Sequence, residues 1–380
     1  MLTLFIISSF LIIYSYVLYP ILLLIWDKLS NAKNCYKTSE DLPGVSILIA
    51  AYNEEKFIKS RIENCFALDY PKDKLEIIIA SDGSSDQTAT IALDYTNKGI
   101  SLFDYKERRG KVNVLNETLP QTKYSIVVFS DANTHFKPDA IKNLVRHFGD
   151  EKIGCVVGRL QFVNAEGSST ADLEGIYWRY ETMLKKLEGK RGCLLGANGG
   201  IFAIRKNLFI KLPPDTIVED FVMPMKILEG GHAVIYEPNA HAIEEAAHKI
   251  IQEKQRRIRI GAGDFQALFR LLPMLNPFKG FPAIAFWSHK VLRWFTPFFM
   301  AISLITNLFL INHPKFLLIF LTQCLFYISA LLGQYLSHVG KHNKIFNLCY
   351  YFVSMNLALF LGFIRYMSGT QSVKWKRTDR

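Results

Sequence analysis

Acidic and amide side chains follow three apolar segments, at the points where buried strands of a parallel sheet would end. The polar clusters are residues 52–55, 82–83 and 131–133, after the apolar segments 45–50, 75–80 and 126–129. In an open α/β sheet, ligands bind beyond the carboxyl ends of the strands. A buried sheet has no need of acids there, so the coincidence of three clusters indicates a functional site.

Asp131 and Asn133 have the residue types and the spacing of metal ligands. They lie two positions apart just past a predicted strand, and in extended backbone such side chains share a face. Mg²⁺ and Mn²⁺ prefer oxygen ligands of this kind. Asn133 offers a carbonyl oxygen with less charge than a carboxylate, so Asp131 is the firmer candidate. A helix cap or an Asx turn is the alternative role for this pair.

Glu219 and Asp220 form a second acidic pair, directly before the apolar segment 222–228. A carboxylate can act as a general base that takes a proton from a hydroxyl group. Acids are also favoured in the first turn of a helix by the helix dipole, so a plain helix start is the alternative interpretation.

Helical spacing of apolar residues follows each of the first two predicted strands. It covers residues 55–68 and 87–96. Alternation of strands and helices predicts an open, mostly parallel α/β sheet. No glycine-rich phosphate loop follows the first strand, which argues against a dinucleotide dehydrogenase and a P-loop NTPase.

The apolar residues of the chain are concentrated at its two ends. The chain has 380 residues, of which 50% are hydrophobic and 21% charged. Residues 2–26 and nearly everything after about residue 281 are apolar, whereas residues 28–259 have the composition of a soluble protein. This division excludes a secreted miniprotein, a fibrous repeat and a polytopic transporter, and it predicts one soluble domain between membrane segments.

We therefore expect five parts along the chain. They are an N-terminal transmembrane anchor (1–27), a soluble catalytic domain (43–263), amphipathic interfacial helices (264–294), about three transmembrane helices (295–368) and a basic tail (369–380). The expected spans in the fourth part are residues 295–311, 316–336 and 345–367.

The net charge of +11 is explained best by membrane topology. Lys28, Lys33 and Lys37 follow the first apolar segment, and residues 254–259 place further basic residues before the last group. Positive residues flank membrane segments on the cytosolic side, which predicts a cytosolic catalytic domain on the cell (inner) membrane.

One span before this domain and three after it would put the basic tail on the other side of the membrane from the domain. One segment is therefore re-entrant, or the count is off by one. No interleaved stripe of basic and aromatic residues marks a nucleic-acid partner.

Residues 47–55, together with Asp82-Gly83-Ser84-Ser85-Asp86, resemble the nucleotide-sugar domain of inverting family 2 glycosyltransferases, which have the GT-A fold. The likeness covers about residues 43–263. The membrane flanks resemble the polysaccharide-synthase branch, which includes poly-N-acetylglucosamine, hyaluronan and chitin synthases. The resemblance implies transfer of a sugar from a nucleotide-diphosphate donor, with UDP expected, to a glycan or lipid-linked acceptor. It also implies a β-linkage and a Mg²⁺ or Mn²⁺ ion that neutralises the leaving group.

The resemblance assigns donor contacts to several residues. Asp82 corresponds to the acid that reads the nucleobase, and Glu54 to the acid that faces the ribose or base. Tyr52 is expected to stack on the base. Lys111 lies in a basic loop before a helix and is expected to contact a phosphate oxygen. Asp131 and Asn133 occupy the D-x-D position.

The resemblance also assigns the acceptor site and the base. The loop of Gly196, Ala197, Asn198 and Gly199 would shape the acceptor site. Glu219-Asp220 matches the family's E-D pair, with Asp220 as the base and Glu219 positioning it.

A basic motif near the membrane corresponds to Q-x-x-R-W of processive members. Arg259 matches its arginine and is an expected diphosphate contact. Arg256, a further expected donor contact, stands at the glutamine position, and Ile260 stands at the tryptophan position. The absent tryptophan favours short products.

Two alternative functions remain open. One is a non-processive transferase that adds a single sugar to a polyprenyl or lipid carrier. The other is a catalytically inactive membrane scaffold that binds nucleotide-sugars, although such a scaffold would not need a base.

A second candidate metal site comprises His241, Glu244, Glu245 and His248, which would share one face of a helix. Their spacing matches no zinc-enzyme motif, so a solvated or interfacial helix is the expected structure.

Overall fold

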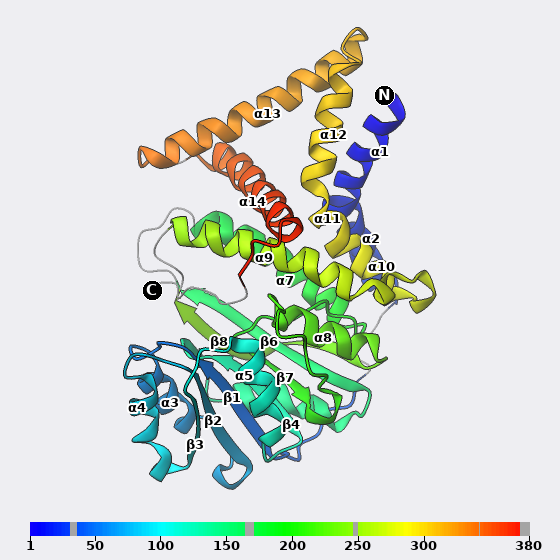
Figure 1. The fold of residues 1–380 in the computed structure, drawn as a ribbon. Helices are drawn as coiled ribbons and strands as arrows, with labels where there is room; N and C mark the ends of the chain where they lie inside the picture. Colours follow the sequence, from blue (N-terminus) through cyan, green and yellow to red (C-terminus); the bar gives the residue numbers. More distant parts are fainter. Residues whose placement is uncertain (31–35, 164–170, 246–249, 342, 373–380) are drawn as a thin grey trace. The chain divides into compact units, whose positions relative to one another are not determined.

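The computed structural model describes residues 1–30, 36–163, 171–245, 250–341 and 343–372 (Figure 1). Contacts divide the chain into two units. The helical unit comprises Met1–Asn31, Glu166–Leu184 and Ile251–Gln371, and the sheet unit comprises Ala32–Ala165, Lys185–Ile250 and Ser372–Arg380. Each unit is described by itself.

The sheet unit contains an eight-stranded sheet, in the described part of the chain, with the order β3-β2-β1-β4-β7-β6-β8-β5. Its parallel half is made of β3 (Ile100–Tyr105), β2 (Leu75–Asp82), β1 (Val45–Ala51) and β4 (Ile126–Asp131). Its other half is made of β7 (Phe202–Arg205), β6 (Ile153–Val163), β8 (Ala233–Glu245) and β5 (Thr134–Phe136). In that half only β6 and β8 pair in parallel. The predicted open, mostly parallel α/β sheet is confirmed.

The central strands of the parallel half are apolar because helices cover both of their faces. Alternate residues of β1, such as Ile47 and Ile49, are fully buried in a core that includes Ile58 and Ile62 of α3 (Ile58–Phe66). Leu48 points to the opposite face, as the period of a strand requires. The remaining helices of this unit are α4 (Thr88–Leu93), α5 (Lys111–Thr118), α6 (Ala140–Val145) and α8 (Glu219–Glu229).

The register of the parallel strands places their polar ends together. Ala50 of β1 pairs with Ala80 of β2 on one side and with Asp131 of β4 on the other. Asp82, at the end of β2, therefore lies at the same edge as Asp131 and the loop that follows β1.

A brace from α3 supports the turn between β4 and β5. The Asn64 side chain accepts from the Phe136 N–H at 2.8 Å and donates to the Phe136 carbonyl at 2.9 Å. The fully buried Arg61 donates to Ser130 Oγ at 3.1 Å, and its guanidinium lies 4.3 Å from the centre of the Phe136 ring. Arg61 and Asn64 thus fix Ser130 and Phe136, which flank the Asp131–Asn133 turn.

The helix expected around residues 241–248 is wrong for the residues that the structure describes. Residues 241–245 belong to β8, which pairs with β6 through Arg159–Val163 and with β5. Hydrogen bonding to two neighbouring strands overrides the helical spacing of His241, Glu244 and Glu245. His248 lies outside the described residues.

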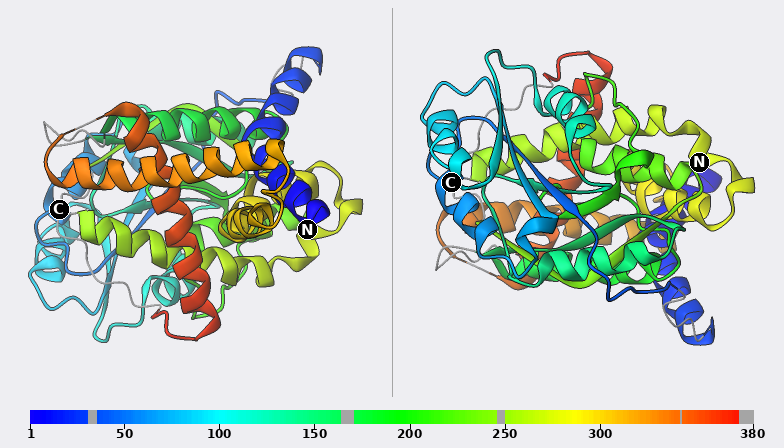
Figure 2. Two further views of the ribbon diagram at one scale, coloured as in Figure 1. Left: turned by 90° about the horizontal axis from the view of Figure 1, so that it is seen from above. Right: turned by 90° about the horizontal axis from the view of Figure 1, so that it is seen from below.

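The helical unit contains three helices long and apolar enough to cross a membrane, among the residues described. They are Leu2–Ser30, α13 (Pro314–His338) and α14 (Lys344–Met367). The first consists of α1 (Leu2–Ile13), the π-helical η1 (Tyr14–Leu18) and α2 (Tyr19–Ser30). Figure 2 shows α13 and α14 crossing each other. These helices indicate a membrane protein.

A bent pair of helices adds a fourth candidate span to this count. Phe281–Trp294, made of α10 (Phe281–Ala285), η9 (Phe286–Val291) and α11 (Leu292–Trp294), meets α12 (Thr296–Leu308) at 61°. α12 has only 13 residues, or about 20 Å, which is shorter than the hydrocarbon core of about 30 Å. α12 covers most of the span expected at residues 295–311, and its crossing of the membrane stays a prediction. α9 (Ile250–Arg270) precedes this pair.

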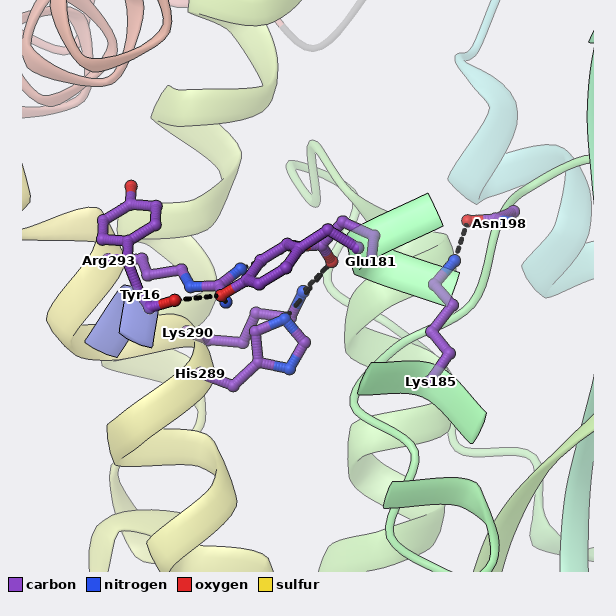
Figure 3. Close-up of polar contacts among 8 residues, drawn as sticks. Tyr16, Glu181, Lys185, Asn198, His289, Lys290 and Arg293 are labelled. Carbon is purple, nitrogen blue, oxygen red and sulfur yellow. Dashed lines mark hydrogen bonds and ion pairs between the residues drawn. The ribbon is translucent and has the colours of Figure 1, made fainter. Parts of the chain in front are cut away.

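A buried ionic cluster links three parts of the helical unit (Figure 3). Glu181 of α7 (Ala171–Gly189) lies 2.5 Å from Arg293, 3.3 Å from His289 and 3.8 Å from Lys290. The Arg293 guanidinium lies 5.0 Å from the centre of the Tyr16 ring. Burial alone would raise the pKa of Glu181, but the three basic neighbours outweigh it and hold that pKa well below its usual value. The cluster therefore fixes α7 by charge pairing within this unit.

Candidate active site

Lys111 joins two acids that lie far apart in the sequence. Its Nζ atom lies 2.8 Å from Asp131 Oδ1 and 2.8 Å from Glu219 Oε1. Lys111 begins α5, Asp131 ends β4 and Glu219 begins α8, so three elements meet at this point. Burial alone would lower the pKa of Lys111, but the two carboxylates outweigh burial and raise the pKa above its usual value. The side chain is therefore an ammonium ion.

Asp220 is connected to Lys111 and Asp131 through Gly199, which lies next to all three side chains. Its Oδ2 atom accepts a hydrogen bond from the Gly199 N–H at 3.0 Å. A Cβ atom on Gly199 would lie 3.3 Å from Asp220 Oδ2, 3.4 Å from Asp131 Oδ2 and 3.6 Å from Lys111 Nζ. The distance to Asp220 is shorter than an ordinary contact, so a side chain at this position would press on that carboxylate. We name Lys111, Asp131, Glu219 and Asp220 the carboxylate cluster.

The charge of the carboxylate cluster suits a divalent cation. Three carboxylates and one ammonium leave two negative charges on these four side chains. Among the described residues, however, no three His, Cys, Asp or Glu side chains are placed to hold a metal ion by themselves. A cation bound at Asp131 would therefore take most of its ligands from phosphate oxygens and water, as Mg²⁺ commonly does.

Asn133 lies in the turn after Asp131, and its amide contacts the other half of the sheet. The Asn133 Nδ2 atom donates to Glu244 Oε1 of β8 at 3.4 Å. The structure thus gives Asn133 a structural partner, and its role as a metal ligand stays a prediction.

Apolar side chains line a small pocket beneath the carboxylate cluster. Leu48, Leu115, Phe129 and Phe202 contribute to it, together with Lys111, Gly199 and Glu219. The rings of Phe129 and Phe202 stack with their centres 4.5 Å apart. An apolar floor of this kind lowers the local dielectric constant and strengthens the ion pairs above it.

Asp82 holds the backbone of the basic loop that precedes Lys111. It is 5% exposed and accepts hydrogen bonds from the N–H groups of Arg109, at 2.6 Å, and Gly110, at 2.9 Å. These bonds fix the start of α5 and hence the position from which Lys111 extends. Recognition of the donor nucleobase by Asp82 stays a prediction.

The loop after β1 is locked to the loop after β2. Asn53 Oδ1 accepts from the Ser85 N–H at 2.8 Å, and the Glu54 N–H donates to Thr88 Oγ1 at 2.7 Å. The Tyr52 ring faces the Arg108 guanidinium at 3.8 Å from its centre. Tyr52 and Glu54 therefore lie on a rigid double loop at the edge where Asp82 and Asp131 end their strands.

The Gly196–Gly199 loop is fastened at both sides. The Ala197 N–H donates to the Asp220 carbonyl at 2.9 Å, and Gly196, at φ +81°, packs against the Phe221 ring. Asn198 Oδ1 accepts from Lys185 Nζ at 2.7 Å (Figure 3).

Lys185 contacts the predicted acceptor loop, although no motif in the sequence singles it out. A single lysine within the helix α7 has the ordinary appearance of a solvated side chain. Its contact with Asn198 becomes visible only in the folded chain.

Arg256 and Arg259 lie on α9 and are both partly buried in the helical unit. Their proposed contacts with the donor stay predictions, as does the meaning of Ile260.

A family model matches the part of the chain that carries Lys111 and Asp131. The model described as "Glycosyl transferase family 2" matches residues 46–212, which include β1, β4 and the acceptor loop. Residues 46–212 therefore match the family that the motifs indicated.

Two curated relatives are poly-β-1,6-N-acetyl-D-glucosamine synthases. The one from Staphylococcus aureus (strain COL) is 29% identical over 249 residues, covering 64% of this chain and 60% of the relative. The one from Staphylococcus epidermidis is 29% identical over 238 residues, covering 61% of this chain and 57% of the relative. The match thus spans about 60% of the length of these relatives.

A solved structure of similar fold is the mannosyltransferase of Pyrobaculum calidifontis in complex with GDP-Man and Mn²⁺. The TM-score is 0.72 with 20% identity, covering 96% of this chain and 99% of that one. This likeness confirms the GT-A fold.

Proposed function

We propose that this protein is a membrane-bound inverting glycosyltransferase that acts in the synthesis of a cell-surface polysaccharide. It transfers a sugar from a UDP-sugar to a glycan or lipid-linked acceptor and forms a β-glycosidic bond. The observation that carries the proposal is the convergence of Asp131, Glu219 and Asp220 around Lys111, at the carboxyl edge of the sheet. The names of the staphylococcal relatives favour N-acetylglucosamine as the sugar.

Asp131 is the residue proposed to hold the divalent cation, and Asn133 is the second candidate ligand. When bound, Mg²⁺ or Mn²⁺ neutralises charge on the departing diphosphate. The net charge of the carboxylate cluster supports this assignment. Lys111 then supplies a second positive charge to the phosphate oxygens.

Asp220 is the proposed general base. Its Oδ2 atom accepts a hydrogen bond from the Gly199 N–H, which fixes the orientation of the carboxylate. Asp220 removes the proton of the acceptor hydroxyl as that oxygen bonds to the anomeric carbon of the donor sugar. The bond from that carbon to the diphosphate breaks on the opposite face, so the configuration inverts.

Glu219 is proposed to position this base rather than to take the proton. It pairs with Lys111 at 2.8 Å, and it precedes Asp220 in the first turn of α8. The Gly196–Gly199 loop is the proposed acceptor side of the site because it bonds to Asp220 through both Ala197 and Gly199.

Ile260 favours a second candidate function. Processive members of the family place a tryptophan where this chain has Ile260, and the absent ring supports addition of a single sugar to a lipid carrier. Product mass separates the two candidates. A ladder of masses indicates a polymerase, and one added sugar indicates the single-addition enzyme.

The proposal is tested with purified membranes that contain the chain. They are incubated with UDP-GlcNAc, UDP-glucose or GDP-mannose and with Mn²⁺ or Mg²⁺, and both nucleotide release and product mass are measured. We expect a UDP-sugar to give a β-linked product, identified by NMR. If membranes containing Asp220→Asn release as much nucleotide from every donor as the wild type, the proposed function is wrong.

A further inference from the structure

Lys111 occupies the coordinating side of the residue proposed to bind the metal ion. Its ammonium donates to Asp131 Oδ1 at 2.8 Å and lies equally close to Glu219. The three side chains are between 13% and 33% exposed, so water screens them less than it screens a surface pair. The pair is thus a substantial part of the electrostatic balance of the site.

A divalent cation and this ammonium compete for the same carboxylate. A cation bound to Asp131 would lie close to an unmoved ammonium, which is 2.8 Å from Asp131 Oδ1, and like charges at short range repel strongly even at an effective dielectric constant of about 20. Asp131 Oδ1 is also already engaged as a hydrogen-bond acceptor.

We propose that Lys111 is an internal counter-cation of the metal site. In the unliganded protein its ammonium offsets part of the negative charge of Asp131 and Glu219, and a divalent cation binds Asp131 tightly only after that ammonium has moved away. This inference rests on the proposed function, because it takes Asp131 as the metal ligand.

The side chain moves and the loop stays in place. The backbone before Lys111 is held by Asp82 through the N–H groups of Arg109 and Gly110. A lysine side chain has a flexible four-carbon stem, so its ammonium can change partners while the start of α5 remains fixed. The diphosphate of the donor is the anion that would receive it. Metal and donor therefore bind together, and metal alone binds weakly.

Titration with Mn²⁺ alone tests the inference without any sugar transfer. The full-length protein is purified, stripped of metal with a chelator, and titrated by isothermal calorimetry. We expect Lys111→Met to bind Mn²⁺ at least about tenfold more tightly than the wild type, because the competing charge is gone. Lys111→Arg keeps the charge and should stay close to the wild type. Lys111→Gln retains a hydrogen-bonding group and repeats the test in case the methionine variant misfolds.

The double variant Lys111→Met/Asp131→Asn locates the effect. We expect it to bind Mn²⁺ less tightly than Lys111→Met alone, because the carboxylate that the metal ion would use, Asp131, is removed. The inference is overturned if neutral variants bind Mn²⁺ no more tightly than the wild type, or if the gain persists without Asp131. Failure of the proposed function would appear elsewhere, as absence of transfer from every donor by wild-type membranes.

Discussion

The carboxylate of Asp220 is bound to the backbone N–H of Gly199 at 3.0 Å, so the proposed base and the proposed acceptor loop form one structural unit. Gly199 belongs to a loop that also donates to the Asp220 carbonyl through Ala197. A change in this loop is therefore expected to disturb the base directly.

Gly199→Ala should impair catalysis more than folding. The new methyl group would press on Asp220 Oδ2, at 3.3 Å, and displace it slightly. A misplacement of reacting groups by about 1 Å costs about 100-fold in rate, and the displacement here is smaller. We expect kcat to fall by about tenfold, with a nearly unchanged melting temperature. Gly230→Ala is the control, because its nearest contact would be 3.4 Å from a backbone oxygen at the end of α8. Equal effects of the two variants on kcat would contradict the assignment.

Lys185→Met should weaken acceptor use while donor affinity stays the same. The variant removes the hydrogen bond of 2.7 Å that holds Asn198 in the acceptor loop. A hydrogen bond from a charged group is worth about 1.5–3 kcal/mol, so we expect the acceptor KM to rise about tenfold or more. Lys186→Met, at the exposed neighbouring position, should have little effect. A rise in donor KM instead would show that Lys185 acts elsewhere.

Glu237 should make the stability of the sheet unit sensitive to acid. Burial alone would raise its pKa, but His147 at 2.6 Å and Arg146 at 2.5 Å outweigh burial and lower the pKa in the folded state. A lowered pKa contributes stability above the ordinary value of about 4.5, and this contribution is lost as the pH falls through the folded-state value.

Thermal unfolding between pH 7 and pH 3.5 measures this contribution. Glu237→Gln should cost about 2–4 kcal/mol at pH 7 by leaving the two basic groups without their carboxylate. The difference from the wild type should shrink as the pH falls below 4.5. A difference that is constant across this range would mean that Glu237 is not ionised in the folded protein.

The parallel half of the sheet could be predicted from the sequence, whereas the other half could not. β1, β2 and β4 are continuous apolar runs because they are buried on both faces. β5 and β7 have only three and four residues, too few for a periodic signal. β8 mixes buried and exposed positions, and the spacing of its last polar residues imitates a helix. Its strand form depends on pairing with β6, which a local pattern cannot reveal.

The site was predicted best where its residues follow strands or form short motifs. Asp131 and the Glu219-Asp220 pair were selected in this way, and the structure brings them together. The pairing of Lys111 with both acids was not predicted, because it depends on how α5, β4 and α8 pack. Lys185 was missed for the same reason: its partner Asn198 belongs to a different element.

Removal of divalent metal should stop transfer. We expect excess chelator to lower turnover about 100-fold or more, equivalent to several kcal/mol of lost charge stabilisation on the leaving group. Mn²⁺ or Mg²⁺ added back should restore the rate in the wild type but not in Asp131→Asn. Full activity in chelator would exclude a metal ion at Asp131.

Asp220→Asn tests the central claim most directly, by comparing the rate of sugar transfer with the affinity for the donor nucleotide. The amide cannot take the acceptor proton, so we predict a loss of about 10²–10⁴ in kcat with UDP affinity close to the wild type. Asp73→Asn, an exposed acid before the amino end of β2, is the matched control and should transfer normally. Transfer by Asp220→Asn at the wild-type rate would contradict the account.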